Sequence, residues 1–257
     1  MNSRTLLLAE DVTVSRPGED GSCDRILERT TLGVTPGEVL AVTGPSGSGQ
    51  STLLLLYNRL LEPDNGRVLL TGKDIRTIPP PDLRAQVPLV AQKPYLFPGT
   101  VSDNLLASAR LRRVELPELQ SRDIKSLIEM CRVEQSWLDR NARKLSVGQQ
   151  QRVCLLRALL GPCKAMLLDE PTSALDRQMG VQLAQTFKLL AAEKGLAIIL
   201  VTHDLEIAQI CADRIALMIS GSVIETGPVA QVLNAPKAEA SRQFLSSAVP
   251  DNGDIAS

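Results

Sequence analysis

Apolar runs of strand length alternate with longer helical stretches along most of the chain. Runs bounded by turn-forming residues predict strands at 5–15, 26–34, 37–44, 66–72, 87–92, 165–170, 196–204, 214–220 and 223–227. Helices are predicted at 51–60, 81–86, 176–195 and 204–213, and again from about Ala235 onward. Strands that alternate with helices in this way indicate an α/β fold with a parallel sheet.

A different pattern covers the middle of the chain, from Thr100 to about Leu160, where no strand is predicted. Thr100 stands three residues before Asp103, an arrangement typical of a helix start. The range 117–133 is amphipathic, with apolar residues near helical spacing at Leu119, Ile124, Leu127, Ile128 and Cys131. We therefore expect an α-helical lobe at about 95–160, inside a domain that spans 1–236. A short helix and a polar C-terminal tail, expected to fray, should occupy 237–257.

The composition of the chain limits the kinds of protein that it can be. With 257 residues, 44% of them hydrophobic, the chain has enough material for one large domain, or for one domain with a lobe. A net charge of -1 gives no electrostatic basis for binding nucleic acid. Five scattered cysteines, without a C-x-x-C pair, are typical of reduced thiols rather than of a disulfide framework or a metal site.

Hydropathy argues against a membrane-spanning chain. No apolar run reaches the roughly 18 residues of a membrane helix, and the N-terminal apolar stretch is too short for a signal peptide. We therefore expect a soluble chain whose link to a membrane, if it has one, is made through a partner.

The stretch TGPSGSGQSTLLLLY, residues 43–57, contains a glycine-rich loop between a predicted strand and a predicted helix. It matches the phosphate-binding pattern G-x-x-x-x-G-K-[ST] at Gly44, Gly49 and Ser51, but Gln50 stands where the lysine is expected. Glycines let backbone N–H groups approach phosphate oxygens, and the serine hydroxyl can bind Mg²⁺. The candidate phosphate contacts are Gly44, Pro45, Ser46, Gly47, Ser48, Gly49, Gln50, Ser51 and Thr52. The alternative is an ordinary strand-to-helix turn that holds two glycines.

The stretch MLLDEP places two carboxylates at the end of a buried strand. Charges at the end of an apolar strand are costly unless they meet a cation or water. Asp169 suits the carboxylate that holds Mg²⁺ in phosphate-loop ATPases, and Glu170 suits a general base for water. A pair of acids that caps the next helix is the alternative interpretation.

The run KLSVGQQQR, residues 144–152, carries the strongest resemblance in the chain. It is similar to the signature L-S-G-G-Q-x-x-R of ABC transporter ATP-binding subunits, which it matches at Leu145, Ser146, Gly148, Gln149 and Arg152. Val147 replaces the first glycine of the signature. A serine-capped helix would explain Ser146 but not the rest of the run. The resemblance implies that Ser146, Gly148 and Gln149 bind the γ-phosphate held by a second subunit.

Further motifs of this family follow in the same order along the chain, and the resemblance extends from about Leu6 to Asn234. Gln92 matches the Q-loop glutamine, which links Mg²⁺ and water to the membrane partner. The segment 173–176 matches the D-loop, and the resemblance implies that its Asp176 contributes to nucleotide binding. His203, the one histidine in the chain, matches the switch histidine near the γ-phosphate, although a capping or packed histidine would explain it if it stood alone.

The resemblance implies a fold, a chemistry and a set of partners. The expected fold is α/β, a phosphate-loop NTPase core with a parallel sheet, an N-terminal antiparallel β part and an α-helical lobe. ATP and Mg²⁺ are the implied cofactors, with Glu170, His203 and Gln92 as catalytic residues. The implied metal contacts are Ser51, Gln92 and Asp169.

The implied partners are a second ATPase subunit in a head-to-tail dimer and multi-span membrane subunits, on which the lobe docks. These partners would place the chain at the cytoplasmic face of a membrane. Within the family, segments such as 57–63 and 92–105 are most similar to phosphate-import ATPases, and equally to a group tied to iron or aluminium tolerance.

The chain departs from the family at its nucleotide contacts. Gln50 offers a neutral amide where a lysine charge is expected, and should forfeit much of the roughly 1.5–3 kcal/mol of a charged hydrogen bond. The family stacks adenine on an aromatic residue near 14–16, but no aromatic residue precedes Tyr57, and Arg16 could stack there instead. Val147 is the mildest change, because it keeps its backbone N–H.

Three functions remain open from the sequence. The chain could be an ATPase subunit that powers a transporter, or a nucleotide-binding or scaffolding subunit with little turnover. It could also be a soluble ABC ATPase of DNA repair or translation. Proteins of that last kind commonly carry paired ATPase units or long coiled-coil inserts, whereas this chain has one set of motifs.

Overall fold

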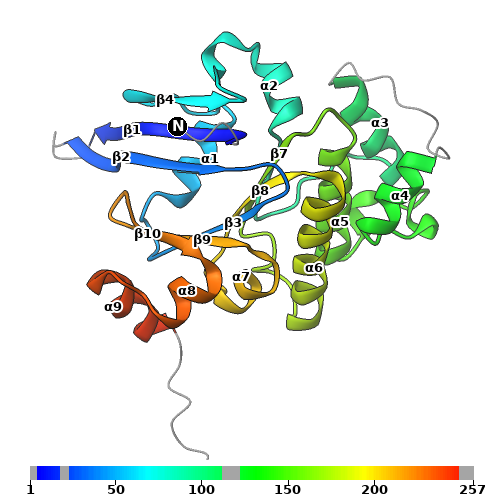
Figure 1. Ribbon diagram of the computed structural model, residues 1–257. Coiled ribbons are helices and arrows are strands. Elements are labelled where there is room, and N and C mark those ends of the chain that lie inside the picture. Colours follow the sequence, from blue (N-terminus) through cyan, green and yellow to red (C-terminus); the bar gives the residue numbers. More distant parts are fainter. Residues whose placement is uncertain (1–4, 18–22, 112–121, 249–257) are drawn as a thin grey trace, which may run out of the picture.

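The computed structural model describes residues 5–17, 23–111 and 122–248 (Figure 1). A six-stranded sheet has the order β10-β9-β3-β8-β7-β6. Its strands are β3 (Val39–Thr43), β6 (Leu89–Val90), β7 (Ala165–Asp169), β8 (Ala197–Val201), β9 (Arg214–Ile219) and β10 (Ser222–Pro228). Neighbours from β9 to β6 are parallel, and β10 is antiparallel to β9. The parallel core and the α/β class predicted from the sequence are confirmed.

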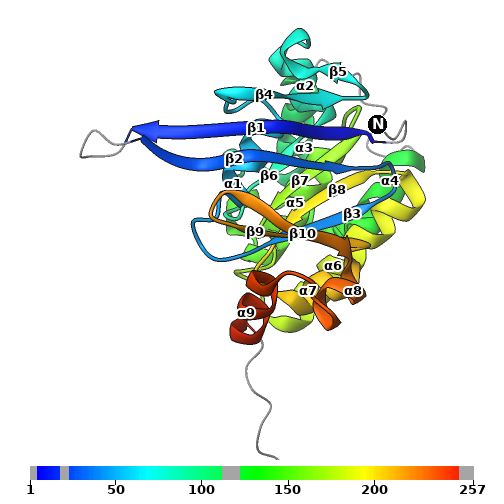
Figure 2. The same ribbon diagram turned by 60° about the vertical axis from the view of Figure 1, so that its left-hand side comes forward.

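A second sheet is antiparallel and has the order β2-β1-β4-β5. It consists of β1 (Leu7–Pro17), β2 (Cys23–Val34), β4 (Asn65–Leu70) and β5 (Lys73–Asp74). Figure 2 shows β2, at the edge of this sheet, lying next to β9 and β10 of the first sheet, with β1 on its other side. This sheet is the predicted N-terminal antiparallel part, and the start of β2 contacts the phosphate loop.

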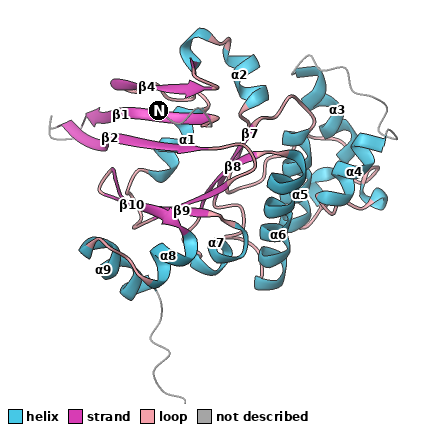
Figure 3. Cartoon of the chain, in the orientation of Figure 1, coloured by secondary structure: helices cyan, strands magenta, loops and turns pink. Residues whose placement is uncertain are grey.

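Helices fill the space on both sides of the six-stranded sheet (Figure 3). They are α1 (Gln50–Tyr57), α2 (Pro80–Gln86), α3 (Val101–Leu111), α4 (Arg122–Met130), α5 (Val147–Leu159), α6 (Arg177–Lys194), α7 (Leu205–Cys211), α8 (Val229–Asn234) and α9 (Glu239–Ala248). Single 3₁₀ turns occur at Ile75–Thr77, Gln135–Trp137 and Ala142–Lys144. In Figure 1, α3 and α4 lie at the right, away from the antiparallel sheet, where the helical lobe is expected.

Several element boundaries differ from the prediction. The predicted strand 87–92 is reduced to β6, because Pro88 lacks an N–H and the chain turns away from the sheet after Val90. The predicted helix 51–60 ends at Tyr57, since Arg59 adopts a left-handed backbone with φ of 56°. The amphipathic prediction 117–133 corresponds to α4, but its beginning falls in 112–121, outside the described residues. The predicted tail 249–257 also lies outside them. The sequence did not predict β5 and α8.

The central strands alternate between two hydrophobic cores. Met166 and Leu168 of β7, with Ile198 of β8, belong to a core that continues through α5 and α6 into the lobe and reaches Trp137. Their sequence neighbours, such as Leu167, belong to a second core, which lies between the sheet, α1 and the antiparallel sheet. Every residue of β8 is buried, as expected for a parallel strand covered on both faces.

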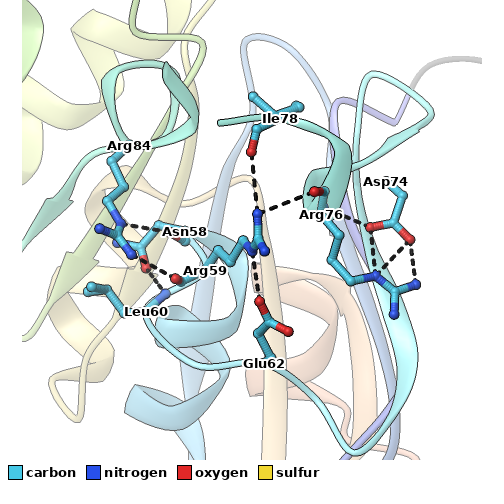
Figure 4. Close-up of polar contacts among 8 residues, drawn as sticks. All are labelled: Asn58, Arg59, Leu60, Glu62, Asp74, Arg76, Ile78 and Arg84. Atoms are coloured by element: carbon cyan, nitrogen blue, oxygen red, sulfur yellow. Dashed lines mark hydrogen bonds and ion pairs between the residues drawn. The ribbon is translucent and has the colours of Figure 1, made fainter. Parts of the chain in front are cut away.

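The end of α1, opposite the phosphate loop, is held by arginines (Figure 4). Arg84 of α2 donates to the carbonyl oxygens of Arg59 at 2.8 Å and Asn58 at 3.4 Å. Arg59 donates to Glu62 at 2.8 Å and, more weakly, to the carbonyl oxygen of Ile78 at 3.4 Å. Positive groups at a helix C-terminus satisfy free carbonyls and complement the helix dipole. These contacts tie α1 to α2, and α2 leads through β6 to Gln92.

Candidate nucleotide-binding and hydrolysis site

The phosphate loop joins β3 to α1, as the sequence predicted. Gly49 caps α1 in a left-handed conformation, with φ of 95°. A Cβ added to Gly49 would lie 2.6 Å from the carbonyl oxygen of Ile26. The loop is therefore pressed against the start of β2, and only glycine fits there.

Replacing Gly49 with alanine is expected to lower the free energy of unfolding by about 2–4 kcal/mol, because backbone strain adds to overlap with Ile26. Gly47 is the matched control: its φ of 81° is also left-handed, but no atom lies within 4 Å of an added Cβ. Gly47→Ala should cost only about 1 kcal/mol of strain. Urea unfolding of the two variants measures the difference. Equal midpoints would contradict the tight contact.

Gln50 is the first residue of α1 and is buried, with 6% of its surface exposed. Its side-chain nitrogen Nε2 donates to the carbonyl oxygen of Gly44 at 3.3 Å. The amide thus bridges the two ends of the loop. This contact is long and joins two neutral groups, so it contributes little beyond positioning the amide.

A cavity of about 320 Å³ opens over the loop. Its lining residues are Arg16, Ile26, Ser46, Gly47, Gly49, Gln50, Ser51, Thr52, Glu170 and His203. The loop therefore faces the cavity along most of its predicted length, while Gly44 and Ser48 are buried beneath it. A larger cavity, of about 510 Å³, lies on the antiparallel sheet among Thr5, Leu8 and Arg67. That cavity has none of the predicted site residues, so the smaller one is the candidate site.

Ser51 and Asp169 form the candidate magnesium contacts. The Ser51 hydroxyl donates to Asp169 Oδ1 at 3.1 Å. Burial raises the pKa of Asp169, and the hydrogen bond from Ser51 opposes that rise. A hydroxyl and one carboxylate suit Mg²⁺, which keeps several waters and binds phosphate oxygens through its other positions. Within the described ranges, no group of three or more His, Cys, Asp or Glu residues could hold a metal by itself.

Glu170 lies between Gln92 and His203. Its Oε2 accepts a hydrogen bond from Gln92 Nε2 at 2.8 Å, and its Oε1 lies 2.9 Å from His203 Nε2. The backbone of Glu170 is left-handed, with φ of 44°, and its N–H donates to the carbonyl oxygen of Val201 at 3.0 Å. Such a conformation in a non-glycine residue is rare and must be held by its surroundings.

Topology explains why these three residues meet. Gln92 follows β6, Glu170 follows β7 and His203 follows β8. These strands are parallel neighbours, so their carboxyl ends share one edge of the sheet. The structure therefore brings together the predicted catalytic residues, although their positions in the chain are far apart.

Two further residues support this group and were not predicted as site residues. The Ser173 hydroxyl accepts from Gln92 Nε2 at 3.1 Å and donates to the carbonyl oxygen of Glu170 at 3.0 Å. The side chain of Gln151, only 2% exposed, donates to the carbonyl oxygen of Ala91 at 3.4 Å. Ser173 lies inside the D-loop segment 173–176, and Gln151 lies inside the signature run 144–152.

The predicted signature residues lie at the start of α5. The Ser146 hydroxyl accepts from the N–H of Gln149 at 3.3 Å, and Gln149 Oε1 accepts from the N–H of Ser146 at 3.1 Å. This capping box fixes the first turn of the helix. Gly148 is buried, and a Cβ there would lie 3.0 Å from the sulfur of Met179. Val147 is 46% exposed and therefore does not disturb this packing.

Asp176 is the N-cap of α6, and its Oδ1 accepts from the N–H of Met179 at 2.9 Å. Neither Asp176 nor the signature residues Ser146, Gly148 and Gln149 line the cavity over the loop. Their contact with nucleotide stays a prediction, and it requires a second copy of the chain. Among the described residues, no helix is long and apolar enough to span a membrane.

Comparisons with known proteins agree with this geometry. Residues 27–173 match the ABC transporter family. The chain is 36% identical to ABC transporter I family member 17 of Arabidopsis thaliana over 82% of this chain and 79% of that protein. It is 35% identical to the methionine import ATP-binding protein MetN of Xanthomonas oryzae pv. oryzae, over 89% of this chain and 69% of the relative.

Among solved structures, the dimeric ATP-binding cassette MJ0796 bound to ADP and Pi superposes with a TM-score of 0.75 and 28% identity. The superposition covers 87% of this chain and 99% of that one. The loop between β3 and α1, the convergence of Gln92, Glu170 and His203, and these matches lead to one conclusion. The chain belongs to the ABC transporter family, as its ATP-binding cassette.

Proposed function

We propose that this cassette hydrolyses ATP as a head-to-tail dimer and drives transport through separate membrane subunits. The observation that carries the proposal is the position of Glu170, held between Gln92 and His203 beside the phosphate loop. A carboxylate in this place can take the proton of a water that attacks the γ-phosphate. The general ATPase activity of the family supports the same conclusion.

Different residues of the chain would bind the phosphates, bind Mg²⁺ and orient the general base. N–H groups of the loop and of the first turn of α1 would hold the phosphates, and Ser51 with Asp169 would hold Mg²⁺. In that position Mg²⁺ would supply positive charge that offsets the negative charge of the phosphates. Gln92 and His203 orient Glu170, and Gln92 lies where the chain leaves the sheet for the lobe.

A dimer is needed to complete the site. Ser146 and Gly148 begin α5 and do not face their own chain's loop, so a second copy must present them to the phosphates. The dimeric cassette described above supports this arrangement. The hydroxyl of Ser146 accepts from the N–H of Gln149, so its proton would be available to a phosphate oxygen held by the second copy.

The segment after Gln92 suits contact with a membrane partner. Tyr95 is 64% exposed, whereas Leu96 next to it is buried. Asn104 of α3 holds the N–H and carbonyl of Phe97 at 2.7 and 3.1 Å. The segment from Gln92 to Phe97 is thus held in place, exposes the ring of Tyr95, and connects the lobe to Glu170 through the hydrogen bond of Gln92. The resemblance to phosphate-import and metal-tolerance proteins makes phosphate or a metal-related solute the proposed substrate, and the cytoplasmic face of a membrane the proposed location.

A second function is favoured by one observation. Gln50 is neutral, buried and turned back to Gly44, so a nucleotide-binding subunit with weak turnover would fit the same site. Phosphate release at rising protein concentration separates the two functions. An ATPase dimer should show a rate per chain that increases with concentration, whereas a binding subunit should show Mg-ATP binding without phosphate release. Absence of Mg-ATP binding would contradict both. Copurification with a multi-span membrane protein would test the partner.

A further inference from the structure

The cavity over the phosphate loop contains little positive charge. In the lining formed by described residues, Arg16 is the one side chain that is cationic at every physiological pH. Gln50 is neutral, and Glu170 contributes a negative charge next to Asp169. A Mg-nucleoside triphosphate keeps a net negative charge, so a site without a cation would repel it. The backbone dipoles of the loop offset only part of this charge.

Arg16 lies near the end of β1, opposite Asp24 of β2 in the strand register. Two residues further along β2, Ile26 contacts Gly49 of the loop through its carbonyl oxygen. The end of the antiparallel sheet therefore lies beside the loop, and Arg16 of β1 lines the same cavity as Gln50 and Ser51.

Arg16 also differs from the arginines near it in its ion pairs within the described residues. Arg25 is paired with Glu28 at 2.6 Å, and Arg29 with Asp11 at 3.0 Å. In the part of the chain that the structure describes, Arg16 forms no ion pair, and its side chain is exposed. A free guanidinium can form paired hydrogen bonds with phosphate oxygens without losing an existing partner.

We propose that Arg16 contacts the polyphosphate of the bound nucleotide and supplies the charge that Gln50 lacks. This inference rests on the proposed nucleotide binding. Arg16 would then bind phosphate although it belongs to strand β1 and not to the phosphate loop. The guanidinium sits on a long, solvent-exposed side chain, so its contribution should be at the lower end for a charged hydrogen bond, about 10-fold in affinity. It should also weaken as salt is raised.

The test compares four proteins: the natural chain, Arg16→Ala, Gln50→Lys and the double variant. Mg-ATP and Mg-tripolyphosphate, which has no base, are titrated against each at low and moderate salt. Arg25→Ala is the control, since it removes a nearby arginine whose charge is already paired. In the natural chain, Arg16→Ala should weaken both ligands about 10-fold, and Arg25→Ala less than 2-fold. In the Gln50→Lys background, the loss caused by Arg16→Ala should shrink to about 2- to 3-fold, because the two cations serve one charge.

Four outcomes would overturn the proposal. Loss of Mg-ATP affinity with no change for Mg-tripolyphosphate would assign Arg16 to the base. An equal loss in the natural chain and in the Gln50→Lys background would show that the two positions act independently. Full Mg-ATP binding by Arg16→Ala would remove Arg16 from the site and leave the proposed function intact. If the natural chain binds neither ligand, nucleotide binding itself fails, and Arg16 cannot be compensating for Gln50.

Discussion

Replacing Glu170 with glutamine is expected to lower ATP hydrolysis by about 10²- to 10⁴-fold, the range that a positioned general base contributes. Glutamine keeps the shape of the side chain and can still contact Gln92 and His203, but it cannot take a proton from water. Substrate binding should change little, because Glu170 is not a predicted phosphate or magnesium contact. Phosphate release under single turnover measures the loss.

The Glu170→Gln variant should also accumulate as an ATP-bound dimer. Sedimentation at saturating Mg-ATP should show this, and it should be run in the Gln50→Lys background so that weak affinity does not hide it. Glu134→Gln is the control, because Glu134 lies in the lobe and contacts Ser136 at 3.1 Å. Retention of more than a tenth of the activity by Glu170→Gln would remove Glu170 as the base. A purely monomeric variant would contradict the head-to-tail dimer.

Replacing Gln50 with lysine should tighten Mg-ATP binding by about 10- to 150-fold in the Arg16→Ala background, which corresponds to roughly 1.5–3 kcal/mol for a charged hydrogen bond. In the chain that keeps Arg16 the gain should be smaller, because both cations then serve the same phosphate charge. In the natural chain the amide is occupied with the carbonyl oxygen of Gly44. A lysine reaching from the same position would add a point charge to phosphate oxygens. Hydrolysis should rise by a larger factor than affinity, since charge on these oxygens grows in the transition state.

Gln50→Met separates charge from packing in this experiment. Methionine has a similar length but no hydrogen-bond donor, so Gln50→Met should bind Mg-ATP no better than the natural chain. Titration with a fluorescent ATP analogue, followed by phosphate release, gives both quantities. Equal affinity and turnover for the natural chain and Gln50→Lys would mean that another cation already does this work.

The sequence predicted the catalytic residues of the site better than the residues and contacts that hold them in place. The family resemblance implied Gln92, Glu170 and His203 as catalytic residues, and the structure brings them together because each follows a strand of the parallel sheet. Ser173 lies in the D-loop segment 173–176, but the sequence did not predict that its hydroxyl bonds both Gln92 and the carbonyl oxygen of Glu170. These bonds accompany the left-handed backbone at Glu170, and no pattern in the sequence indicates that conformation. Gln50 was recognised as a departure, yet its contact with Gly44 follows from the loop's three-dimensional path.

Long-range contacts explain the remaining misses in the fold. The arginine contacts at the end of α1 join residues such as Arg84 and Asn58 that are 26 positions apart, and hydrophobic periodicity carries no information about such pairs. The strand β5 spans only Lys73–Asp74 and is defined by its pairing with β4, not by its own composition. The strand 87–92 was predicted too long because periodicity could not show where the chain leaves the sheet.

The helical lobe and the parallel sheet share one hydrophobic core, which affects how the protein unfolds. This core begins on one face of β7 and β8 and continues through α5 to Trp137 in the lobe without a break. In the described parts of the lobe, 95–111 and 122–160, the buried apolar residues larger than alanine therefore belong to the same core as one face of the sheet. Elements that share one packed core are expected to unfold as one cooperative unit. On heating, near-ultraviolet signal from Trp137 should accordingly be lost at the same temperature as far-ultraviolet signal from the whole chain.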